Sequence, residues 1–235
     1  MSDKADKEKG DILRQFFKRW PRFYYAVAHI FGPIWFTGLS PKDFLSQYGI
    51  NGVVVNIGSG PRRIKDGVVN IDAHAYAEVD VVGDITALPL EANSVQGIIC
   101  DNVLEHVSDP KKAMEEIHRV LAPKGVAYIS TPFLYAFHSS PSDFYRWTHE
   151  GYAQLCKDFA IREVGVRGGT FSSLVVLLAH AFARVFSCGS LSVYWVYVNI
   201  FIILFSPLKL LDVVLNLFPF GEFSASVYYV VIEKS

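Results

Sequence analysis

The chain has 235 residues, 51% of them apolar, and a formal net charge of −1 at neutral pH. This length suits one domain of ordinary size, the apolar fraction excludes a disordered chain, and the near-zero charge argues against a nucleic-acid-binding protein, which needs a basic excess. The three cysteines, Cys100, Cys156 and Cys188, are far apart and odd in number, which excludes a disulfide scaffold and a cysteine-based zinc site and suits a reducing compartment.

The N-terminal region has two parts. Residues 1–11 are a charged run that predicts a disordered terminus without a secretory signal, so a cytoplasmic location is expected. Residues 12–48 are predicted to form aromatic and basic helices, because the stretch from Ile12 to Phe36 interleaves nine aromatic residues with arginine and lysine. This mixture is typical of an interfacial membrane anchor. The plainer interpretation is a segment that packs on the domain surface or at a dimer interface.

The middle of the chain, residues 52–170, alternates short apolar runs with turn signals and amphipathic stretches, which predicts an α/β sheet. The runs are nearly all apolar, as expected of parallel strands that helices cover on both faces. The predicted strands are 53–57, 68–71, 79–82, 97–100, 126–129, 161–166 and, near the end of the chain, 226–232.

The clearest predicted helix runs from Pro110 to Leu121. Asp109 is a suitable N-cap, Pro110 suits the first helical position, and apolar residues recur at helical spacing along the segment. A second helix is predicted over residues 148–159.

An apolar segment interrupts this pattern before the last predicted strand. Residues 172–221 carry only three formal charges, Arg184, Lys209 and Asp212, and the mean hydropathy of the chain, +0.26, is high for a freely soluble protein. Residues 171–224 are therefore predicted to be a helical insertion. The strands before and after the insertion belong to one sheet. The insertion must therefore leave the sheet domain and return to it on the same side of a membrane. This excludes a single membrane span and leaves a hairpin of two or three helices that dips into a membrane or pairs with a second subunit.

Glycines and acidic residues follow the predicted strands at their carboxyl ends, where parallel sheets bind ligands. The glycine turn 58–60 follows the first strand, Asp72 and Asp84 end the second and third, and Asp101 ends the fourth. The glycines let a ligand approach the backbone, and a carboxylate at Asp72 can accept hydrogen bonds from both hydroxyls of a ribose. One carboxylate alone is more often a loop residue or a helix cap. The recurrence of carboxylates at one sheet edge predicts a nucleoside site.

The connection after the glycine turn distinguishes between nucleotide cofactors. A dinucleotide site needs a helix after the glycines and an acidic residue about 20 residues further on. Only residues 61–67 separate the turn from the next strand, which is too short for a crossover helix, and Asp72 follows Gly58 by 14 residues. These spacings disfavour NAD and FAD and favour a ligand with one nucleoside and no diphosphate.

Six short motifs follow one another through this region. They are residues 56–62 (NIGSGPR), 70–72 (NID), 79–85 (VDVVGDI), 87–90 (ALPL), 102–107 (NVLEHV) and 116–125 (EIHRVLAPKG). In this order and at this spacing they resemble a class I S-adenosylmethionine-dependent methyltransferase of the small type 11 group, over the segment Val53 to Thr148. The stretch from Pro132 to Thr148 is also similar to a subgroup found in polysaccharide-modifying and lipid-modifying pathways.

The resemblance implies a Rossmann-like, mostly parallel seven-stranded sheet with an antiparallel last strand, formed by residues 49–170 and 225–235. It also implies S-adenosylmethionine as the cofactor. The residues implied at the cofactor are Asn56, Gly58, Ser59 and Gly60 at the glycine turn, Asp72 and Ala73 at the ribose, Asp84 and Ile85 at the adenine, and Asp101 and Asn102 near the methionine part. Asn56 stands where the family usually has an acidic residue.

Methyl transfer requires a nucleophile aligned with the carbon–sulfur bond, and a hydroxyl acceptor also requires a base. The candidate catalytic residues are His106, just past the fourth strand, and His138, Asp143, Tyr145 and Arg146 beyond the fifth. Histidine or aspartate can remove a proton, and arginine can bind an anionic acceptor. The plainer interpretation of these residues is a helix-face histidine and a salt-bridged loop. No metal site is predicted, because the histidine and acidic residues show no ligand spacing.

Three functions remain open from the sequence. The first is a methyltransferase for a lipid-linked glycan or another apolar acceptor, peripheral on the inner face of the cytoplasmic membrane and docked there through 12–36 and 172–221. The second is a soluble small-molecule methyltransferase with the insertion as its homodimer interface. The third is a non-catalytic module that binds S-adenosylmethionine. None of the three involves nucleic acid.

Overall fold

The computed structural model describes residues 31–138 and 142–235. The chain divides into two compact units. Unit 2 comprises Phe36–Gly168 and Phe220–Ser235, and unit 1 comprises Gly169–Pro219 together with the N-terminal part of the chain up to Trp35. The predicted disorder of residues 1–11 and most of the predicted anchor over 12–36 lie outside the described residues.

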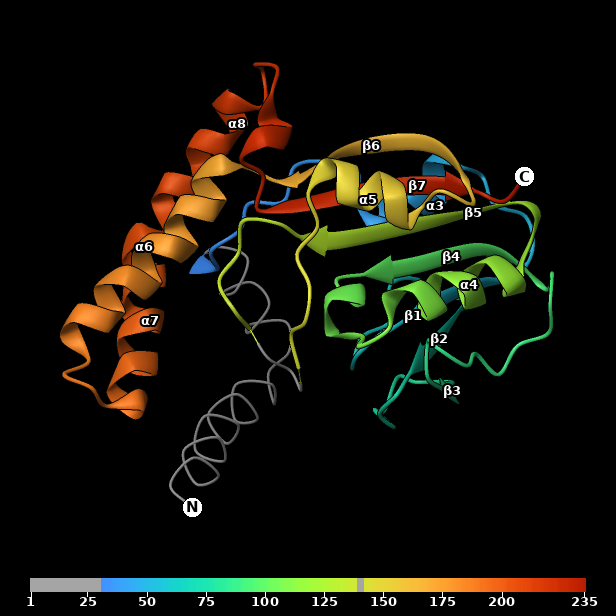
Figure 1. The fold of residues 1–235 in the computed structure, drawn as a ribbon, viewed down its shortest axis with the longest axis horizontal. Helices are drawn as coiled ribbons and strands as arrows, with labels where there is room; N and C mark the ends of the chain where they lie inside the picture. Colours follow the sequence, from blue (N-terminus) through green and yellow to red (C-terminus); the bar gives the residue numbers. More distant parts are fainter. Residues whose placement is uncertain (1–30, 139–141) are drawn as a thin grey trace. The chain divides into compact units, whose positions relative to one another are not determined.

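Unit 2 is built on a seven-stranded sheet with the strand order β3-β2-β1-β4-β5-β7-β6 (Figure 1). The strands are β1 (Val54–Ile57), β2 (Val68–Asp72), β3 (Val81–Val82), β4 (Val95–Asp101), β5 (Leu121–Pro132), β6 (Ala160–Gly168) and β7 (Val227–Glu233). Strands β1 to β5 pair in parallel, and β7 runs antiparallel to both β5 and β6. This arrangement confirms the predicted mostly parallel sheet with an antiparallel last strand.

The strand register brings the predicted site residues to one edge of the sheet. Ile57 of β1 pairs with Ile71 of β2 on one side and with Cys100 of β4 on the other. The residues that directly follow these three positions are Gly58, Asp72 and Asp101, so they lie at the same edge. The sequence predicted this placement from the carboxyl ends of parallel strands.

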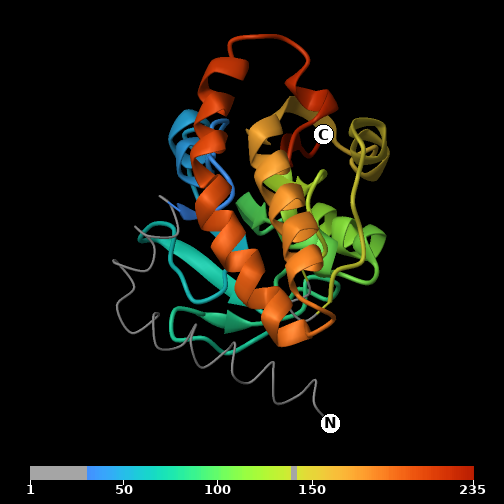
Figure 2. The ribbon, with the colours of Figure 1, turned by 90° about the vertical axis from the view of Figure 1, so that its left-hand side faces the viewer.

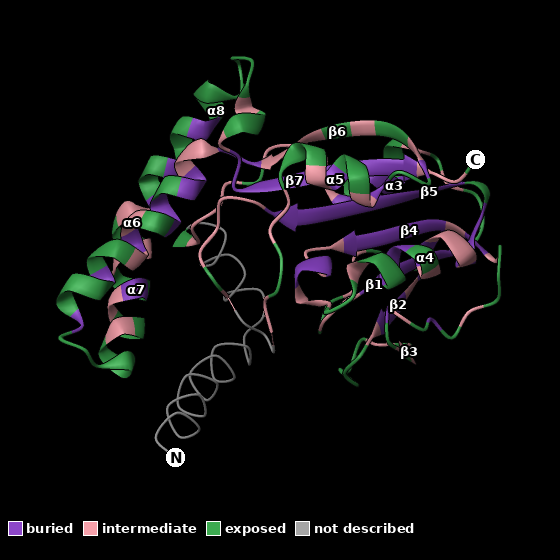
Figure 3. Ribbon diagram, viewed as in Figure 1, coloured by how far each residue is buried: buried purple, intermediate pink, exposed green. Residues whose placement is uncertain are grey.

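Helices cover both faces of the sheet because the strand side chains alternate between two apolar clusters. The first cluster joins strand residues such as Val55 and Ile129 to α4 (Pro110–Val120) and α5 (His149–Leu155). The second joins Val54 and Tyr128 to α3 (Pro41–Gln47), whose Phe44 is fully buried. Figure 3 shows the strands between these helices as buried. The sheet is therefore a rigid platform for the loops at its carboxyl edge.

The helices begin at side chains that cap their first backbone amides. Asp109 accepts a hydrogen bond from the Lys112 N–H at 3.1 Å, with Pro110 at the first helical position, as predicted. Thr148 caps α5 in the same way. Helix α5 ends at Leu155, four residues before the predicted end at Phe159, because residues 156–158 form a turn that leads into β6.

The connection from β1 to β2 contains no helix, as its length predicted. Arg63 holds this connection in place. Its guanidinium donates to the Asp80 carboxylate at 2.8 Å and 3.1 Å, to Glu78 at 3.2 Å and to the Val68 carbonyl at 2.9 Å. Because Glu78 and Asp80 turn toward Arg63, β3 forms only over Val81–Val82 instead of the predicted residues 79–82.

The described part of unit 1 is dominated by a helical hairpin. Helix α6 (Thr170–Phe186) lies alongside α7 (Leu191–Phe205), which continues through a 3₁₀ turn η2 (Ser206–Leu210) into α8 (Leu211–Leu215) (Figure 2). Aromatic rings from the two helices join them: Phe182 contacts Phe201 and Phe205 at centroid distances of 5.4 Å. The insertion is therefore helical, as predicted.

The second arm of the hairpin has the dimensions of a membrane-spanning helix. Leu191–Leu215 forms 25 continuous helical residues with a mean hydropathy of 2.1, and only 22% of its most apolar window is buried inside the protein. A helix of that length measures about 37 Å, against about 30 Å for the hydrocarbon core of a bilayer. Large apolar residues such as Val196 and Leu204 are more than half exposed along it. Figure 3 shows much of the hairpin as exposed.

One buried carboxylate fixes the base of the hairpin. Asp212 of α8 is fully buried and accepts hydrogen bonds from the Phe171 N–H at 2.7 Å, the Ser172 N–H at 2.9 Å and the Ser172 hydroxyl at 2.7 Å. It thus caps the first turn of α6, where the helix dipole favours a negative charge. A Cβ at Gly169 would lie 2.5 Å from this carboxylate, so Asp212 can lie this close to the start of α6 only with glycine at position 169.

Replacement of Asp212 by alanine is expected to destabilise the hairpin by about 2–4 kcal/mol, because it leaves three buried donors of α6 without an acceptor. Asp212→Asn keeps one acceptor oxygen and is expected to lose less. Limited proteolysis at the turn over residues 187–190, in one fixed detergent, measures the effect, with the exposed Asp158→Ala as control. Equal cleavage rates for Asp212→Ala and the wild type would show that the cap contributes nothing.

Candidate functional site

The glycine turn at the end of β1 adopts backbone conformations that favour glycine. Gly58 and Gly60 have φ angles of +67° and +59°, and the Gly58 N–H donates to the Ile71 carbonyl at 2.8 Å. A Cβ at Gly58 would lie 2.4 Å from Val103, so the turn after β4 packs directly on this glycine. A Cβ at Gly60 would meet no atom within 4 Å. The turn therefore presents open space at Gly60, as expected of a loop that a ligand approaches.

Asp72 lies beside this open space at the end of β2. Its carboxylate accepts hydrogen bonds from the Gly60 N–H and the His74 N–H, both at 2.8 Å, and its side chain is 12% exposed. Each carboxylate oxygen has a second lone pair, so both oxygens can still accept from a diol. The structure thus brings together the glycine turn and the carboxylate predicted for a ribose. Ala73 follows it as an exposed residue.

Three other residues of the predicted cofactor set have partners within the protein. Asp84 is exposed, and one of its oxygens accepts from both the backbone N–H and the hydroxyl of Thr86 at 2.8 Å. Ile85 is buried in the apolar core, which leaves its backbone as the part that can meet a ligand. Asn56 is buried and donates to Asn70 at 3.1 Å, so its side chain ties β1 to β2.

Asp101 and Asn102 form a tight turn at the end of β4. Asn102 has a φ of +55°, and its N–H donates to the Ser130 carbonyl at 3.1 Å. The Asn102 side chain donates to the Asp101 carboxylate at 3.2 Å, and that carboxylate also accepts from the Ser130 hydroxyl. The turn leads into η1 (Leu104–His106), which contains the next two polar residues, Glu105 and His106.

His138, Asp143 and Arg146 form one connected group beyond β5. Arg146 donates two hydrogen bonds to the Asp143 carboxylate, at 2.5 Å and 2.7 Å, and Asp143 accepts from the His138 N–H at 2.8 Å. Burial opposes ionisation of Asp143, but these hydrogen bonds outweigh it and hold the pKa of Asp143 at about 2. Burial lowers the pKa of His138, which keeps its imidazole neutral and able to accept a proton.

Tyr145 joins this group through its backbone carbonyl, which accepts from Arg146 at 2.7 Å. Its hydroxyl donates to the Ser108 carbonyl at 3.0 Å, and its ring stacks on Trp147 at 5.5 Å. With Asp143 and Arg146 it lines a cavity of about 240 Å³. A larger cavity of about 660 Å³ lies between α4 and α5, and its lining includes none of the residues at the carboxyl edge of the sheet. Cavity volume alone therefore does not locate the site.

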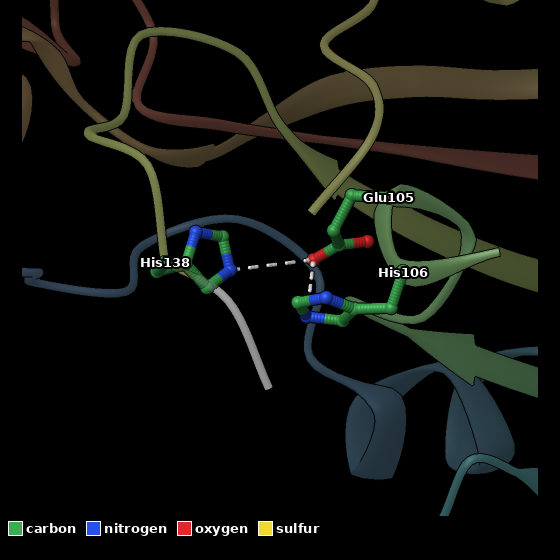
Figure 4. A group of neighbouring side chains, drawn as sticks. All are labelled: Glu105, His106 and His138. Carbon is green, nitrogen blue, oxygen red and sulfur yellow. Dashed lines mark ion pairs between the residues drawn. The ribbon is translucent and has the colours of Figure 1, made fainter. Parts of the chain in front are cut away.

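Glu105 is the functional candidate that the sequence did not suggest. It is fully buried in η1, and neither of its carboxylate oxygens has a hydrogen-bond partner among the described residues. Burial raises the pKa of Glu105 to about 8, with a smaller opposing effect of Arg146. The Nε2 atoms of His106 and His138 lie 3.8 Å and 3.9 Å from its Oε1 (Figure 4). The fold thus joins two sequence candidates, 32 positions apart, around a buried acid.

The signal for Glu105 was present in the sequence. It stands inside the motif Leu104–Glu105–His106, where a charged residue follows a buried strand and an apolar turn. Charged residues in such a position are almost never fully buried without a partner, so an acid there points to a functional role.

Residues 53–129, which run from β1 into β5, match the family model Methyltransf_11, a methyltransferase domain. This segment contains the glycine turn, Asp72, the Asp101–Asn102 turn and Glu105. This segment is similar to a methyltransferase domain. Methyltransferases of this family use S-adenosylmethionine, which is the cofactor that the resemblance of the sequence motifs implied.

The chain also matches curated relatives over part of their length. Malonyl-[acyl-carrier protein] O-methyltransferase 1 of Coxiella burnetii is 37% identical over 75 residues, which cover 31% of this chain and 27% of that protein. The chain spans about a quarter of the length of the curated relatives it matches. The shared segment is thus only a part of each of these proteins.

Solved structures share the fold at low identity. A Galdieria sulphuraria protein assigned as a sarcosine dimethylglycine methyltransferase has a TM-score of 0.53, with 16% identity, over 91% of this chain and 97% of that one. Phosphoethanolamine N-methyltransferase 2 of Haemonchus contortus, solved with S-adenosyl-L-methionine, has a TM-score of 0.50, with 17% identity, over 89% of this chain and 56% of that one. These likenesses concern the fold alone.

The residues of this methyltransferase domain fit the cofactor. The open space at Gly60, the positive φ angles of the turn and the adjacent Asp72 carboxylate form a cradle that a side chain at Gly60 would fill. The absence of a helix between β1 and β2 suits a ligand without a diphosphate. Gly58, Gly60 and Asp72 are therefore the residues that would hold the nucleoside part.

Proposed function

We propose that this protein is an S-adenosylmethionine-dependent methyltransferase that acts on a lipid-linked glycan or another apolar acceptor at a membrane surface. The observation that carries the methyl-transfer part is the contact between the Gly60 N–H and the Asp72 carboxylate inside a matched methyltransferase domain. The observation that supports the membrane part is the exposed apolar hairpin of α6 and α7. The chemistry is that of a transferase and needs no redox partner.

The bound cofactor supplies a methyl group that is already activated by its sulfonium. The protein's own residues bind the cofactor and the acceptor, align them with each other and exclude water. Asp72 and the glycine turn hold the nucleoside end at the edge of the sheet. Val103 packs on Gly58, and Glu105 and His106 follow it in η1, so the chain leads directly from the glycine turn's neighbour to these two residues.

A hydroxyl acceptor needs a group that takes its proton. The neutral imidazole of His138 can accept it, and the buried Glu105 beside it is a second acceptor when ionised. The Asp143 carboxylate positions His138 by accepting a hydrogen bond from the backbone N–H of His138. Arg146 balances the negative charge of Asp143. Arg146 also lines the adjacent cavity, where it is the cation that an anionic group of the acceptor would meet.

The hairpin favours the membrane over a second copy of the chain. The arm Leu191–Leu215 matches the thickness of a bilayer, and its two charged residues, Lys209 and Asp212, are buried inside unit 1. Lys209 donates to the Gly32 carbonyl at 2.6 Å. The exposed surface of this arm is therefore without formal charge, as lipid contact requires. A homodimer interface of a soluble small-molecule methyltransferase is the second candidate function for the same surface.

The full-length chain is expected to float with phospholipid vesicles on a density gradient, and Ile200→Lys with Ile203→Lys is expected to reduce the floated fraction at least about tenfold. Both side chains are about half exposed, so lysine is tolerated in the folded protein but opposes insertion by roughly 2.5–3.5 kcal/mol per charge. Exposed Glu115→Lys on α4 is the control. A chain that stays soluble and dimeric without detergent, and ignores vesicles, contradicts the membrane proposal and favours the dimer.

Transfer of a labelled methyl group from S-adenosylmethionine tests the catalytic proposal. With a membrane extract as the source of acceptor, the wild type is expected to label an organic-extractable product and Asp72→Ala is expected to label none. Label that appears only in the aqueous phase would favour the soluble small-molecule function. No label in either phase, with the cofactor bound, would favour a non-catalytic module.

A further inference from the structure

Glu105, His106 and His138 form a three-residue cluster, an arrangement that proton acceptance by His138 alone does not require. One acid oxygen and one nitrogen of each imidazole lie within 4.8 Å of one another. Glu105 and His106 come from η1, and His138 comes from the segment after β5 (Figure 4). The three side chains converge from two elements on one point, which is the arrangement of ligands around an ion.

The Glu105 carboxylate is the strongest sign that something is bound there. Its side chain has an exposed fraction of 0%, and both oxygens lack a hydrogen-bond partner among the residues that the structure describes. A carboxylate removed from water is costly unless a cation or donors compensate it. The guanidinium of Arg146 supplies only a small part of this compensation, because it makes its two short hydrogen bonds to Asp143.

The two imidazoles are oriented as metal-ligating histidines are. The Nδ1 of His106 faces the Ser142 carbonyl, and the Nδ1 of His138 faces the Ala136 carbonyl at 3.3 Å and the Asp143 carboxylate at 3.4 Å. Acceptors at Nδ1 favour the tautomer that carries its proton there and a lone pair at Nε2. The Arg146 guanidinium also lies 3.2 Å from the His138 Nδ1. It donates its hydrogen bonds to the Ala136 carbonyl and the Asp143 carboxylate, which are the same acceptors that this Nδ1 faces.

In that tautomer each Nε2 lone pair faces the Glu105 Oε1. The separations of 3.8 Å and 3.9 Å are too long for hydrogen bonds, and when Glu105 is ionised the three acceptors that face one another repel. A cation between them would bind all three at once.

We propose that Glu105, His106 and His138 bind a divalent transition-metal ion. Two imidazole nitrogens and one carboxylate oxygen suit zinc, iron, cobalt or nickel better than magnesium or calcium, which prefer oxygen ligands alone. Three protein ligands leave at least one coordination position open. Asp143 positions His138 from outside, as a carboxylate beside a metal-ligating histidine does.

The use of that open position rests on the proposed function. An acceptor hydroxyl that coordinates the ion would lose its proton more easily, because the ion stabilises the resulting oxygen anion. The metal site itself does not depend on this role and can be tested alone.

The test is a titration of the untagged full-length chain with Co²⁺ after treatment with EDTA and dialysis, followed by the visible d–d absorption of the bound ion. The wild type is expected to bind a single equivalent of Co²⁺, which Zn²⁺ displaces. Glu105→Gln and His138→Asn are expected to bind at least about tenfold more weakly, and Asp143→Asn about tenfold more weakly. Exposed His149→Asn is the matched control and is expected to bind as the wild type does.

Two results would overturn the site: no stoichiometric binding of Co²⁺ to the wild type, or equal affinity in Glu105→Gln and the wild type. Circular dichroism and calorimetry with S-adenosylhomocysteine on the same samples show whether each variant is folded and whether it binds the cofactor product. Variants that bind S-adenosylhomocysteine but not Co²⁺ are folded and support the site. Wild type that binds Co²⁺ but not S-adenosylhomocysteine supports the metal site and counts against the proposed function.

Discussion

Replacement of Asp72 by alanine is expected to weaken the binding of S-adenosylhomocysteine at least about 100-fold. The variant loses a carboxylate that can accept from both ribose hydroxyls, and charge-assisted hydrogen bonds contribute about 1.5–3 kcal/mol each. It also releases the Gly60 N–H and the His74 N–H that the carboxylate holds at 2.8 Å. Isothermal titration calorimetry measures the change.

Asp66→Ala is the matched control for this experiment. Asp66 lies in the same connection between β1 and β2, and it is exposed. We expect its affinity for S-adenosylhomocysteine to equal that of the wild type. Equal affinity in Asp72→Ala as well would mean that the nucleoside does not bind at the glycine turn.

Glu105→Gln is expected to stabilise the metal-free protein at high pH, by on the order of 4 kcal/mol at pH 9, with little effect near pH 4.5. Burial raises the pKa of Glu105 in the folded chain to about 8, from an ordinary value near 4.5. A raised pKa means that the folded state holds the proton more tightly than the unfolded state. The contribution of Glu105 is therefore fully present below about pH 4.5 and is lost as the pH rises toward 8.

The groups around Glu105 agree with this direction. The carboxylates of Asp101 and Asp143 oppose its ionisation, and Arg146 favours it. His106 and His138 face its Oε1 from two sides.

Urea unfolding at pH 5 and pH 9 in the presence of EDTA measures the difference, and exposed Glu91→Gln is the control. Glutamine has nearly the same shape and no charge to bury. A Glu105→Gln variant that is less stable than the wild type at pH 9 in EDTA would show that the ionised carboxylate has a stabilising partner, and the account of Glu105 would be wrong.

The sheet and its carboxyl edge were accessible from the sequence because strand ends follow simple rules. Apolar runs ended by glycine or aspartate placed Gly58, Asp72 and Asp101 together, and the register of β1, β2 and β4 confirms this. The short connection after the glycine turn predicted the missing helix in the same way. These features depend on local sequence and on the geometry of parallel strands.

The features that the sequence missed depend on contacts between distant segments. Glu105 and His138 are separated by 33 positions, and only the path of the chain after β5 brings them to 3.9 Å. The shortened β3 results from Arg63, whose contacts with Asp80 no periodicity reveals. The sequence showed Asp212 only as one of three charges in an apolar segment. Its role as a cap of α6 depends on the hairpin, which brings α8 to the start of α6.

The measurement that tests the central claim most directly is a calorimetric titration of the full-length wild type with S-adenosylhomocysteine. We predict that one molecule binds per chain and that the heat disappears in Asp72→Ala. A folded wild-type protein that releases no heat with S-adenosylhomocysteine or with S-adenosylmethionine would contradict the assignment of the glycine turn and Asp72 as a cofactor site.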